Sequence, residues 1–286
     1  MDCSEFCKTM YDFMYQQKFN EYLAGRTSKA ATEDSERKAQ HEAIIYAFQT
    51  AIEEYPDTNV TAIWNAIYRA HLFRKIDITN INDIDENVVD AIISGSQSWK
   101  KSSGHVFEDY VCRATKDRLA QYNIQFVLQK ELTQMLSNGQ IANDASDHID
   151  EVCGSENFDI YAIVNVNGNN IVFGCVQAKT SIRDRVGRDR EFSSQIMDKN
   201  FWSAAVVLDG TYLAMPKFET MVNGGGTTQY SENGWHGMYS MSNAEERDRI
   251  YDDKYLSLLI GDARQAAEKF TSARQRFTRN WQALHE

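Results

Sequence analysis

Residues 158–179 constrain the fold more than any other stretch, because they predict a β-hairpin with reactive groups at one end. Two apolar, β-branched runs, FDIYAIV and IVFGCVQAK, flank the polar turn NGNN. A turn of this kind between two such runs is typical of a hairpin. Pairing about a centre near Gly168 places Asp159 opposite residue 177 or 179. Gln177 and Lys179 share one face of their strand, because successive side chains alternate between faces.

The predicted hairpin brings a carboxylate, Asp159, and an ammonium, Lys179, to one end of a hydrophobic sheet. Such a pair can hold a divalent metal and activate water, as hydrolysis of a phosphodiester requires. A metal nuclease usually carries Glu or Asp two residues before this lysine, where this chain has Gln177. Another carboxylate must then supply the charge, and Glu191 and Glu108 are the candidates. The alternative is an ion pair at the sheet rim, worth roughly 0–1 kcal/mol.

Composition limits the class of protein. A chain of 286 residues that is 42% hydrophobic and 25% charged predicts one large globular domain or two intimate ones. It contains no apolar run of about 18 residues, so no membrane span is expected, and the polar N-terminus does not resemble a signal peptide. Five cysteines without a CxxC pair favour free thiols and a cytoplasmic location.

The net charge of −11 argues against a nucleic-acid partner, but phosphate binding depends on the local density of cations. Residues 179–190 hold five cations and two anions: Lys179, Arg183, Arg185, Arg188 and Arg190, with Asp184 and Asp189. An arginine-acid-arginine triplet suits base reading, because arginine binds guanine and the carboxylate accepts from cytosine. The alternative is a solvated helical turn with ion pairs four residues apart.

The rest of the chain predicts helices around further strands, an α/β or mixed α+β fold. Residues 1–93 have the apolar spacing of helices, and SGSQSWKKSSG (94–104) predicts a loop after which Ser103 caps another helix. We therefore expect a helical N-terminal part at 1–95 and a catalytic domain at 96–286.

Three other features have a less specific meaning. In the predicted loop, Trp99 precedes two cations, Lys100 and Lys101, which suit contact with phosphates or simply flank a half-buried tryptophan. The glycines at 224–226 lack the Lys-Ser/Thr ending of a phosphate loop, so no nucleotide cofactor is expected. Lone histidines such as His236 and His105 favour structural roles.

Three long segments, taken together, resemble type II restriction endonucleases of the BsaWI kind, which cut sites with a CCGG core; AgeI is a more distant likeness. The segments are SWKKSSGHVFEDYV (98–111), VFGCVQAKTSIRDRVGRDRE (172–191) and MPKFETMVNGGGTTQYSENGWHGMY (215–239). The resemblance implies a PD-(D/E)xK core, with a central mixed sheet flanked by helices. It also implies a homodimer that binds a palindromic site in double-stranded DNA.

The resemblance assigns roles to residues of this chain. Asp159 matches the metal-binding acid, Lys179 the lysine that positions the attacking water, and Glu108 a helix-borne glutamate near the metal. Gln177 stands where such enzymes often lack the acid, and Glu191 is the candidate for the acid that replaces it. The implied metal is Mg²⁺.

The resemblance also places base reading in the arginine cluster. Arg183, Asp184 and Arg185 match the element that reads the CCGG core, although Arg188 belongs to a second copy of the motif at 188–190. The expected reaction is cleavage at a site such as T/CCGGA or W/CCGGW, which leaves 5′-phosphates. The sequence leaves two alternatives open: a structure-selective repair or recombination nuclease, and a noncatalytic DNA-binding protein in which Gln177 marks a decayed site.

Overall fold

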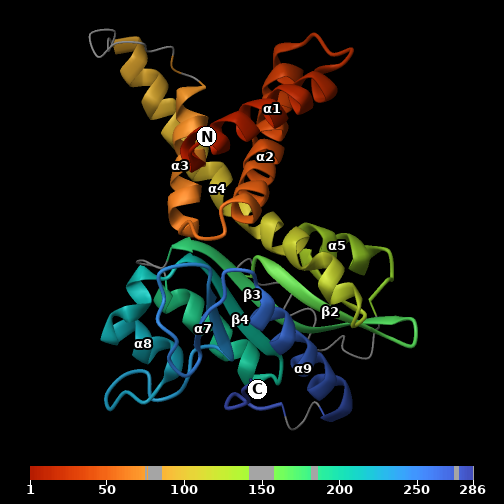
Figure 1. Cartoon of the computed structure of the whole chain (residues 1–286). Helices are drawn as coiled ribbons and strands as arrows, with labels where there is room; N and C mark the ends of the chain where they lie inside the picture. Colours follow the sequence, from red (N-terminus) through yellow and green to blue (C-terminus); the bar gives the residue numbers. More distant parts are fainter. Residues whose placement is uncertain (75, 77–85, 142–157, 182–185, 274–276, 286) are drawn as a thin grey trace. The chain divides into compact units, whose positions relative to one another are not determined.

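The computed structural model describes all residues except 75, 77–85, 142–157, 182–185, 274–276 and 286, and the side chains of Glu86, Lys101 and Ser181 also lie outside the description. The chain forms two compact units, which we call the N-terminal unit (Met1–Phe107) and the C-terminal unit (Glu108–Glu286). The N-terminal unit is helical, whereas the C-terminal unit contains the sheet (Figure 1).

The N-terminal unit contains α1 (Cys3–Leu23), α2 (Lys29–Glu54), α3 (Val60–Phe73) and the first part of α4 (Glu86–Ala120). The first three helices begin at polar caps. Asp2 accepts from the Glu5 N–H, Ser28 from the Ala31 N–H and Asn59 from the Thr61 N–H. These caps satisfy backbone donors that have no partner within the helix.

Helix α4 corrects the prediction of a loop at 94–104, because it runs unbroken through this segment. Serine and glycine reduce helix stability by up to about 1 kcal/mol each relative to alanine, which is why the segment suggested a loop. Tertiary packing outweighs this cost. Trp99 is buried with its ring 5.3 Å from that of Trp64, and the Ser96 hydroxyl accepts from the Tyr68 hydroxyl. Ser103 lies inside the helix and does not cap one.

The C-terminal unit is built on one six-stranded sheet with strand order β1-β2-β3-β4-β5-β6. Strands β1 to β3 pair antiparallel, and β3 to β6 pair parallel. This mixed sheet confirms the predicted fold class. The strands are β1 (Ile124–Leu128), β2 (Ile160–Val166), β3 (Asn169–Ser181), β4 (Trp202–Asp209), β5 (Gly237–Ser240) and β6 (Ile250–Asp252).

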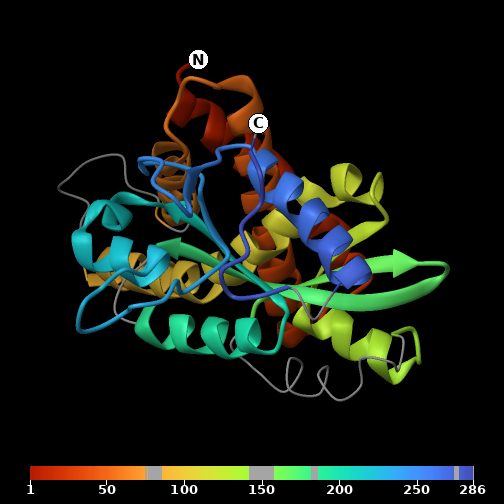
Figure 2. The ribbon, with the colours of Figure 1, turned by 90° about the horizontal axis from the view of Figure 1, so that it is seen from below.

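Helices cover both faces of the sheet. Figure 2 shows α7 and α9 on opposite sides of the strands. The helices of this unit, besides the end of α4, are α5 (Gln129–Ser137), α7 (Val186–Asp198), the short η3 (Thr211–Ala214), α8 (Pro216–Asn223) and α9 (Ser257–Ala273).

The β2–β3 hairpin has the predicted turn and one feature that was not predicted. Asn167 and Gly168 connect the strands with φ of 52° and 88°, the left-handed conformation that Asn-Gly turns favour. Further along, Ala162 faces Gly174 while Ile163 faces Val172, so Phe173 is an extra residue that forms a β-bulge. Beyond the bulge Ile160 faces Val176, and Asp159 and Gln177 are the next residues outward on the two strands.

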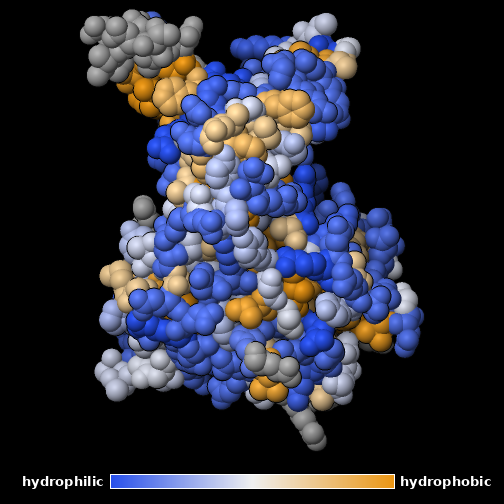
Figure 3. All heavy atoms as spheres, viewed as in Figure 1, coloured by the Kyte–Doolittle hydropathy of each residue, from blue (hydrophilic) through white to orange (hydrophobic). Residues whose placement is uncertain are grey.

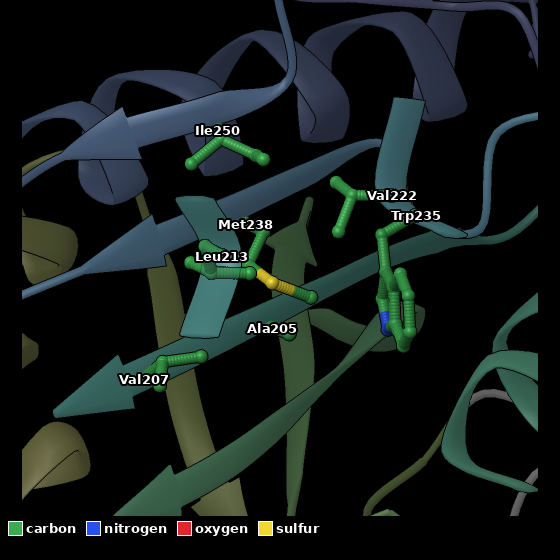
Figure 4. Close-up of a cluster of buried hydrophobic side chains, with 7 residues drawn as sticks. All are labelled: Ala205, Val207, Leu213, Val222, Trp235, Met238 and Ile250. Carbon is green, nitrogen blue, oxygen red and sulfur yellow. The ribbon is translucent and has the colours of Figure 1, made fainter. Parts of the chain in front are cut away.

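On one face of the parallel strands, side chains of β4, β5 and β6 pack with side chains of η3, α8 and the segment before β5 to form a buried cluster. Figure 4 shows its members, with Trp235 at one end: Ala205, Val207, Leu213, Val222, Trp235, Met238 and Ile250. Burial of these side chains fixes the position of Trp235, because a packed core leaves little room for rotamer change.

The visible surface is largely hydrophilic (Figure 3). Among the helices in the described part of the chain, none is both long and apolar enough to cross a bilayer.

Candidate active site

Asp159 and Lys179 meet at the end of the β2–β3 hairpin, as the sequence predicts. The Lys179 ammonium lies 2.9 Å from Oδ2 of Asp159, and the backbone N–H of Ala178 donates to the same oxygen at 2.9 Å. The two side chains are partly buried, with 18% of Asp159 and 32% of Lys179 exposed. The carboxylate is thus held by the strand and by the ammonium while part of it faces solvent.

The charge on Lys179 reflects its surroundings. Burial lowers the pKa of this lysine, but the negative charges of Asp159, Asp189 and Glu108 outweigh burial and raise the pKa above its usual value. Asp189 belongs to the first turn of α7, and Glu108 is the first residue of α4 in the C-terminal unit. Three carboxylates, one just before β2, one on α7 and one on α4, therefore act on one ammonium, which stays protonated at neutral pH.

Gln177, in the position where many nucleases have an acid, is turned into the protein. It is 1% exposed, and its Oε1 accepts from the indole N–H of Trp235 at 2.8 Å. Its Nε2 donates to the backbone carbonyl of Asp189 at 3.2 Å. The amide therefore links β3 to α7 and to the buried cluster.

The second arginine-acid-arginine copy has one anchored arginine. Arg190 donates from Nε to the carbonyl of Met221 at 3.0 Å and from Nη2 to the carbonyl of Glu232, and its guanidinium lies 4.9 Å from the centre of the Tyr230 ring. Arg188 is exposed, 5.5 Å from the centre of the Phe192 ring. The predicted base-reading triplet, Arg183, Asp184 and Arg185, lies outside the described residues.

The remaining predicted residues are more dispersed. Glu191 lies on α7 with its side chain exposed, and no described contact joins it to Asp159 or Lys179. Lys100 is exposed on α4 in the N-terminal unit. Lys101 lies on the same helix, with its side chain outside the description. His105 is also in that unit, where it lines a hollow with Tyr22 and His41.

His236 has the structural role that the sequence favoured. Its Nδ1 accepts from the backbone N–H of Ser203 at 3.0 Å, and Nε2 lies 3.2 Å from the carbonyl of Thr278. Burial, followed by the positive charges of Arg249 and Arg279, lowers the pKa of His236 to about 3. The ring is therefore neutral at neutral pH and joins β4 to the end of the chain.

Carboxylate oxygens make the site suitable for a hard divalent cation. Mg²⁺ is usually held by one or two carboxylates together with water and phosphate oxygens, rather than by a complete cage of protein ligands. Asp159 supplies such an oxygen, and Asp189 and Glu108 add negative charge nearby. Within the part of the chain that the structure describes, no three His, Cys, Asp or Glu side chains gather as a complete metal site. The carboxylate of Asp159 fits an ion of this kind as one of its oxygen ligands.

Sequence reasoning missed Asp189 and Trp235. The sequence indicates Asp189 only as an anion among the cations of residues 179–190, although its distance along the chain from Lys179 is close to that of Glu191. Trp235 is 58 residues from Gln177, and no local pattern indicates their hydrogen bond.

Comparisons with known proteins agree with this geometry. A search of the curated proteins finds no match. Residues 141–276 match the model of the family described as BsaWI restriction endonuclease type 2. The structure is similar to that of the pre-specific restriction endonuclease BsaWI in its DNA complex, with 40% sequence identity, complete coverage of both chains and a TM-score of 0.66.

A second solved structure shares the fold. It is the specific restriction endonuclease AgeI in its DNA complex, with 19% identity, 88% of this chain and 91% of that chain covered, and a TM-score of 0.50. The family match, the full-length similarity and the paired Asp159 and Lys179 lead to one conclusion. The chain belongs to the BsaWI family of type II restriction endonucleases, which are site-specific deoxyribonucleases.

Proposed function

We propose that this protein cuts both strands of a short palindromic duplex with a CCGG core, in a reaction that depends on Mg²⁺ and leaves 5′-phosphate and 3′-hydroxyl ends. The observation that carries the proposal is the contact between Asp159 and Lys179 at the open end of the hairpin. The full-length similarity to BsaWI, whose solved structure is a DNA complex, supports the choice of substrate.

Asp159 is the proposed metal-binding acid, and Glu108 is proposed to act near the metal. Asp189 is proposed as a further acid near the metal, because its charge acts on Lys179. Glu191 remains the candidate, predicted from the sequence, for the acid that replaces the one missing at residue 177. When bound, Mg²⁺ would offset the negative charge that develops on the phosphate and polarise the attacking water.

Lys179 is proposed to orient the attacking water and the scissile phosphate as a hydrogen-bond donor. The neighbouring carboxylates raise its pKa, which favours the charged ammonium and suits a hydrogen-bond donor. Its contact with Asp159 fixes the direction of the side chain, which limits the positions that water can take. No step requires a covalent enzyme intermediate.

Sequence specificity is assigned to the first arginine-acid-arginine copy. Arg183 and Arg185 would bind guanines of the core, and Asp184 would accept from a cytosine. The anchoring of Arg190 supports this choice, because its guanidinium already binds two backbone carbonyls. Lys100, Lys101 and Arg188 are proposed to contact phosphates. The flanking pairs are proposed to be A·T or T·A, as in T/CCGGA or W/CCGGW.

A homodimer is the proposed active form, because a two-fold symmetric dimer matches the symmetry of a palindrome and offers one active site to each strand. Sedimentation of the protein with and without a cognate duplex would test this. A dimer on DNA is expected, and a monomer that remains alone on its uncut cognate site would contradict it.

Digestion of a plasmid of known sequence, with and without Mg²⁺, tests the reaction. Discrete fragments only with Mg²⁺, whose sequenced ends all lie at CCGG sites, are the expected result. Cutting at branched or damaged DNA regardless of sequence would indicate a structure-selective nuclease instead. A gel shift without any cutting would indicate a noncatalytic DNA-binding protein.

The Arg185→Ala variant tests base reading, with binding to cognate and random duplexes measured at one salt concentration. Loss of one bidentate contact should weaken cognate binding by about 1–3 kcal/mol and leave binding to random DNA nearly unchanged. Equal weakening of both would assign Arg185 to a phosphate.

A further inference from the structure

Gln177 stands two residues before Lys179, yet its amide faces away from the solvent side of the site. Among the contacts of the described residues, this amide meets a donor, the indole N–H of Trp235, and an acceptor, the carbonyl of Asp189. A side chain that serves both must accept at one end and donate at the other. Glutamine does so, whereas ionised glutamate only accepts.

The acceptor belongs to Asp189, which this hydrogen bond holds against β3 only two residues along the strand from Lys179. Asp189 is in the first turn of α7, so the bond from Gln177 to its carbonyl ties that turn to β3. Trp235 holds the other end of the amide and is itself 1% exposed at one end of the buried cluster (Figure 4). Through Gln177 and Trp235, the backbone of Asp189 is therefore linked to the buried cluster beside the sheet.

Arg190, the next residue, holds the same turn from another direction. It donates to the carbonyl of Met221 at the end of α8 and to that of Glu232 in the following loop. Gly234 permits this arrangement, because a Cβ there would lie 2.8 Å from Cγ of Arg190 and 2.4 Å from the Met221 carbonyl oxygen. The backbone of Asp189 is thus fixed on one side by Gln177 and on the other by the anchored Arg190.

We propose that Gln177 is a positioning residue, which sets the place of Asp189 relative to Lys179 and thereby the rate of DNA cutting. On this account, residue 177 is glutamine because only a side chain that both accepts and donates can link Trp235 to Asp189. It does not mark a decayed metal ligand. The inference rests on the proposed function, since it deepens the role of the same site.

Two substitutions separate this role from that of a metal ligand. Gln177→Met keeps the length and removes both hydrogen bonds. Gln177→Glu keeps an acceptor for Trp235 but places a carboxylate against the carbonyl of Asp189. Loss of a residue that orients a site residue typically lowers activity about 10–100-fold, so we expect a fall of that size in the single-turnover cutting rate for both. Cognate DNA binding in Ca²⁺ should stay within a few-fold of wild type.

A double-mutant cycle tests whether Gln177 acts through Asp189. Once Asp189→Asn has removed the charge, adding Gln177→Met should cost little further rate, because both changes affect the same group. Additive losses would overturn the proposal. Gln40→Met is a matched control, since Gln40 is a similarly buried glutamine in the N-terminal unit, and it should leave the rate unchanged.

Hydrogen exchange gives a readout that needs no cutting. In Gln177→Met, amides of residues 186–192 should exchange faster, while those of α9 keep the wild-type rate. Unchanged exchange at 186–192 would refute the proposal that Gln177 positions Asp189. A Gln177→Glu protein that binds Mn²⁺ more tightly and cuts at the wild-type rate would refute it as well. Failure of the wild-type protein to cut any CCGG plasmid would instead reject the proposed function, and the exchange result would still stand.

Discussion

His236 offers a prediction whose size follows from the structure. The buried ring is neutral, with its pKa lowered to about 3 from an ordinary value of 6.5, and burial is the main cause. In the unfolded chain the same imidazole takes up a proton near its ordinary pKa. Between these two values the unfolded state binds one more proton than the folded state, so its free energy falls relative to that of the folded state.

The sign of the effect follows directly. A lowered pKa contributes stability that is present above pH 6.5 and is lost as the pH falls towards 3. Each pH unit in this window is worth about 1.4 kcal/mol, so at pH 5 the loss from His236 alone is about 2 kcal/mol. Other titrating groups act on wild type and on a His236 variant alike and cancel in the difference between them.

The perturbation is His236→Asn, which removes the titration and keeps a side-chain oxygen to accept from the Ser203 N–H. The assay is urea unfolding from pH 8 to pH 5, followed by near-ultraviolet circular dichroism. We expect the variant to be less stable at pH 8 and the gap in unfolding free energy to narrow by about 2 kcal/mol by pH 5. A gap that is constant or widens in acid would refute the assignment of a neutral, buried ring.

Activity of the same variant separates structure from catalysis. His236 contacts two backbone groups and no residue of the Asp159–Lys179 pair in the described contacts. At pH 8, folded His236→Asn should cut DNA within a few-fold of the wild-type rate. Loss of several orders of magnitude in a folded variant would place His236 in the catalytic machinery.

Three further predictions concern backbone geometry and anchoring. Gly174→Ala should destabilise the protein by at least about 1–3 kcal/mol in thermal unfolding, because the new Cβ would lie 2.5 Å from the carbonyl oxygen of Trp202. Unchanged stability would contradict the close approach of β3 and β4. Asp253→Ala should cost about 1–2 kcal/mol, because the carboxylate accepts from the Ser257 and Leu259 N–H groups at the start of α9, and no loss in urea unfolding would show that this cap is dispensable. Arg190→Lys should speed proteolysis of the loop at 224–234, since a lysine cannot replace the forked contacts, whereas Arg188→Lys should not.

Local chemistry made the hairpin and the contact between Asp159 and Lys179 predictable. Asn167-Gly168 and the apolar runs beside it indicate a turn and two strands, and these fix the approximate register. The bulge at Phe173 was not predictable, because residues 172–178 are all buried and show no alternation of polar and apolar side chains that an extra residue could interrupt. The uncertainty of one or two residues in the sequence-based register is of the same size as the shift that the bulge introduces.

Other features depend on contacts between distant residues. The loop prediction at 94–104 was wrong because small polar residues lower helix propensity, and the sequence does not show that Trp99 packs on Trp64. The bond between Gln177 and Trp235 likewise depends on how β3 and the segment before β5 are placed in the sheet. The sequence therefore predicted the contact between Asp159 and Lys179, and the three-dimensional structure showed which residues hold its surroundings in place.

The most direct test of the account is the cutting rate of Lys179→Ala on a duplex with one CCGG site. Wild type and Lys8→Ala, in which an exposed lysine on α1 is replaced, are compared under the same Mg²⁺ concentration. The account predicts that Lys179→Ala binds the cognate duplex with near-wild-type affinity but shows no measurable cleavage, while Lys8→Ala cuts normally. Substantial cleavage by pure Lys179→Ala would contradict the claim that the Asp159–Lys179 pair is the catalytic centre.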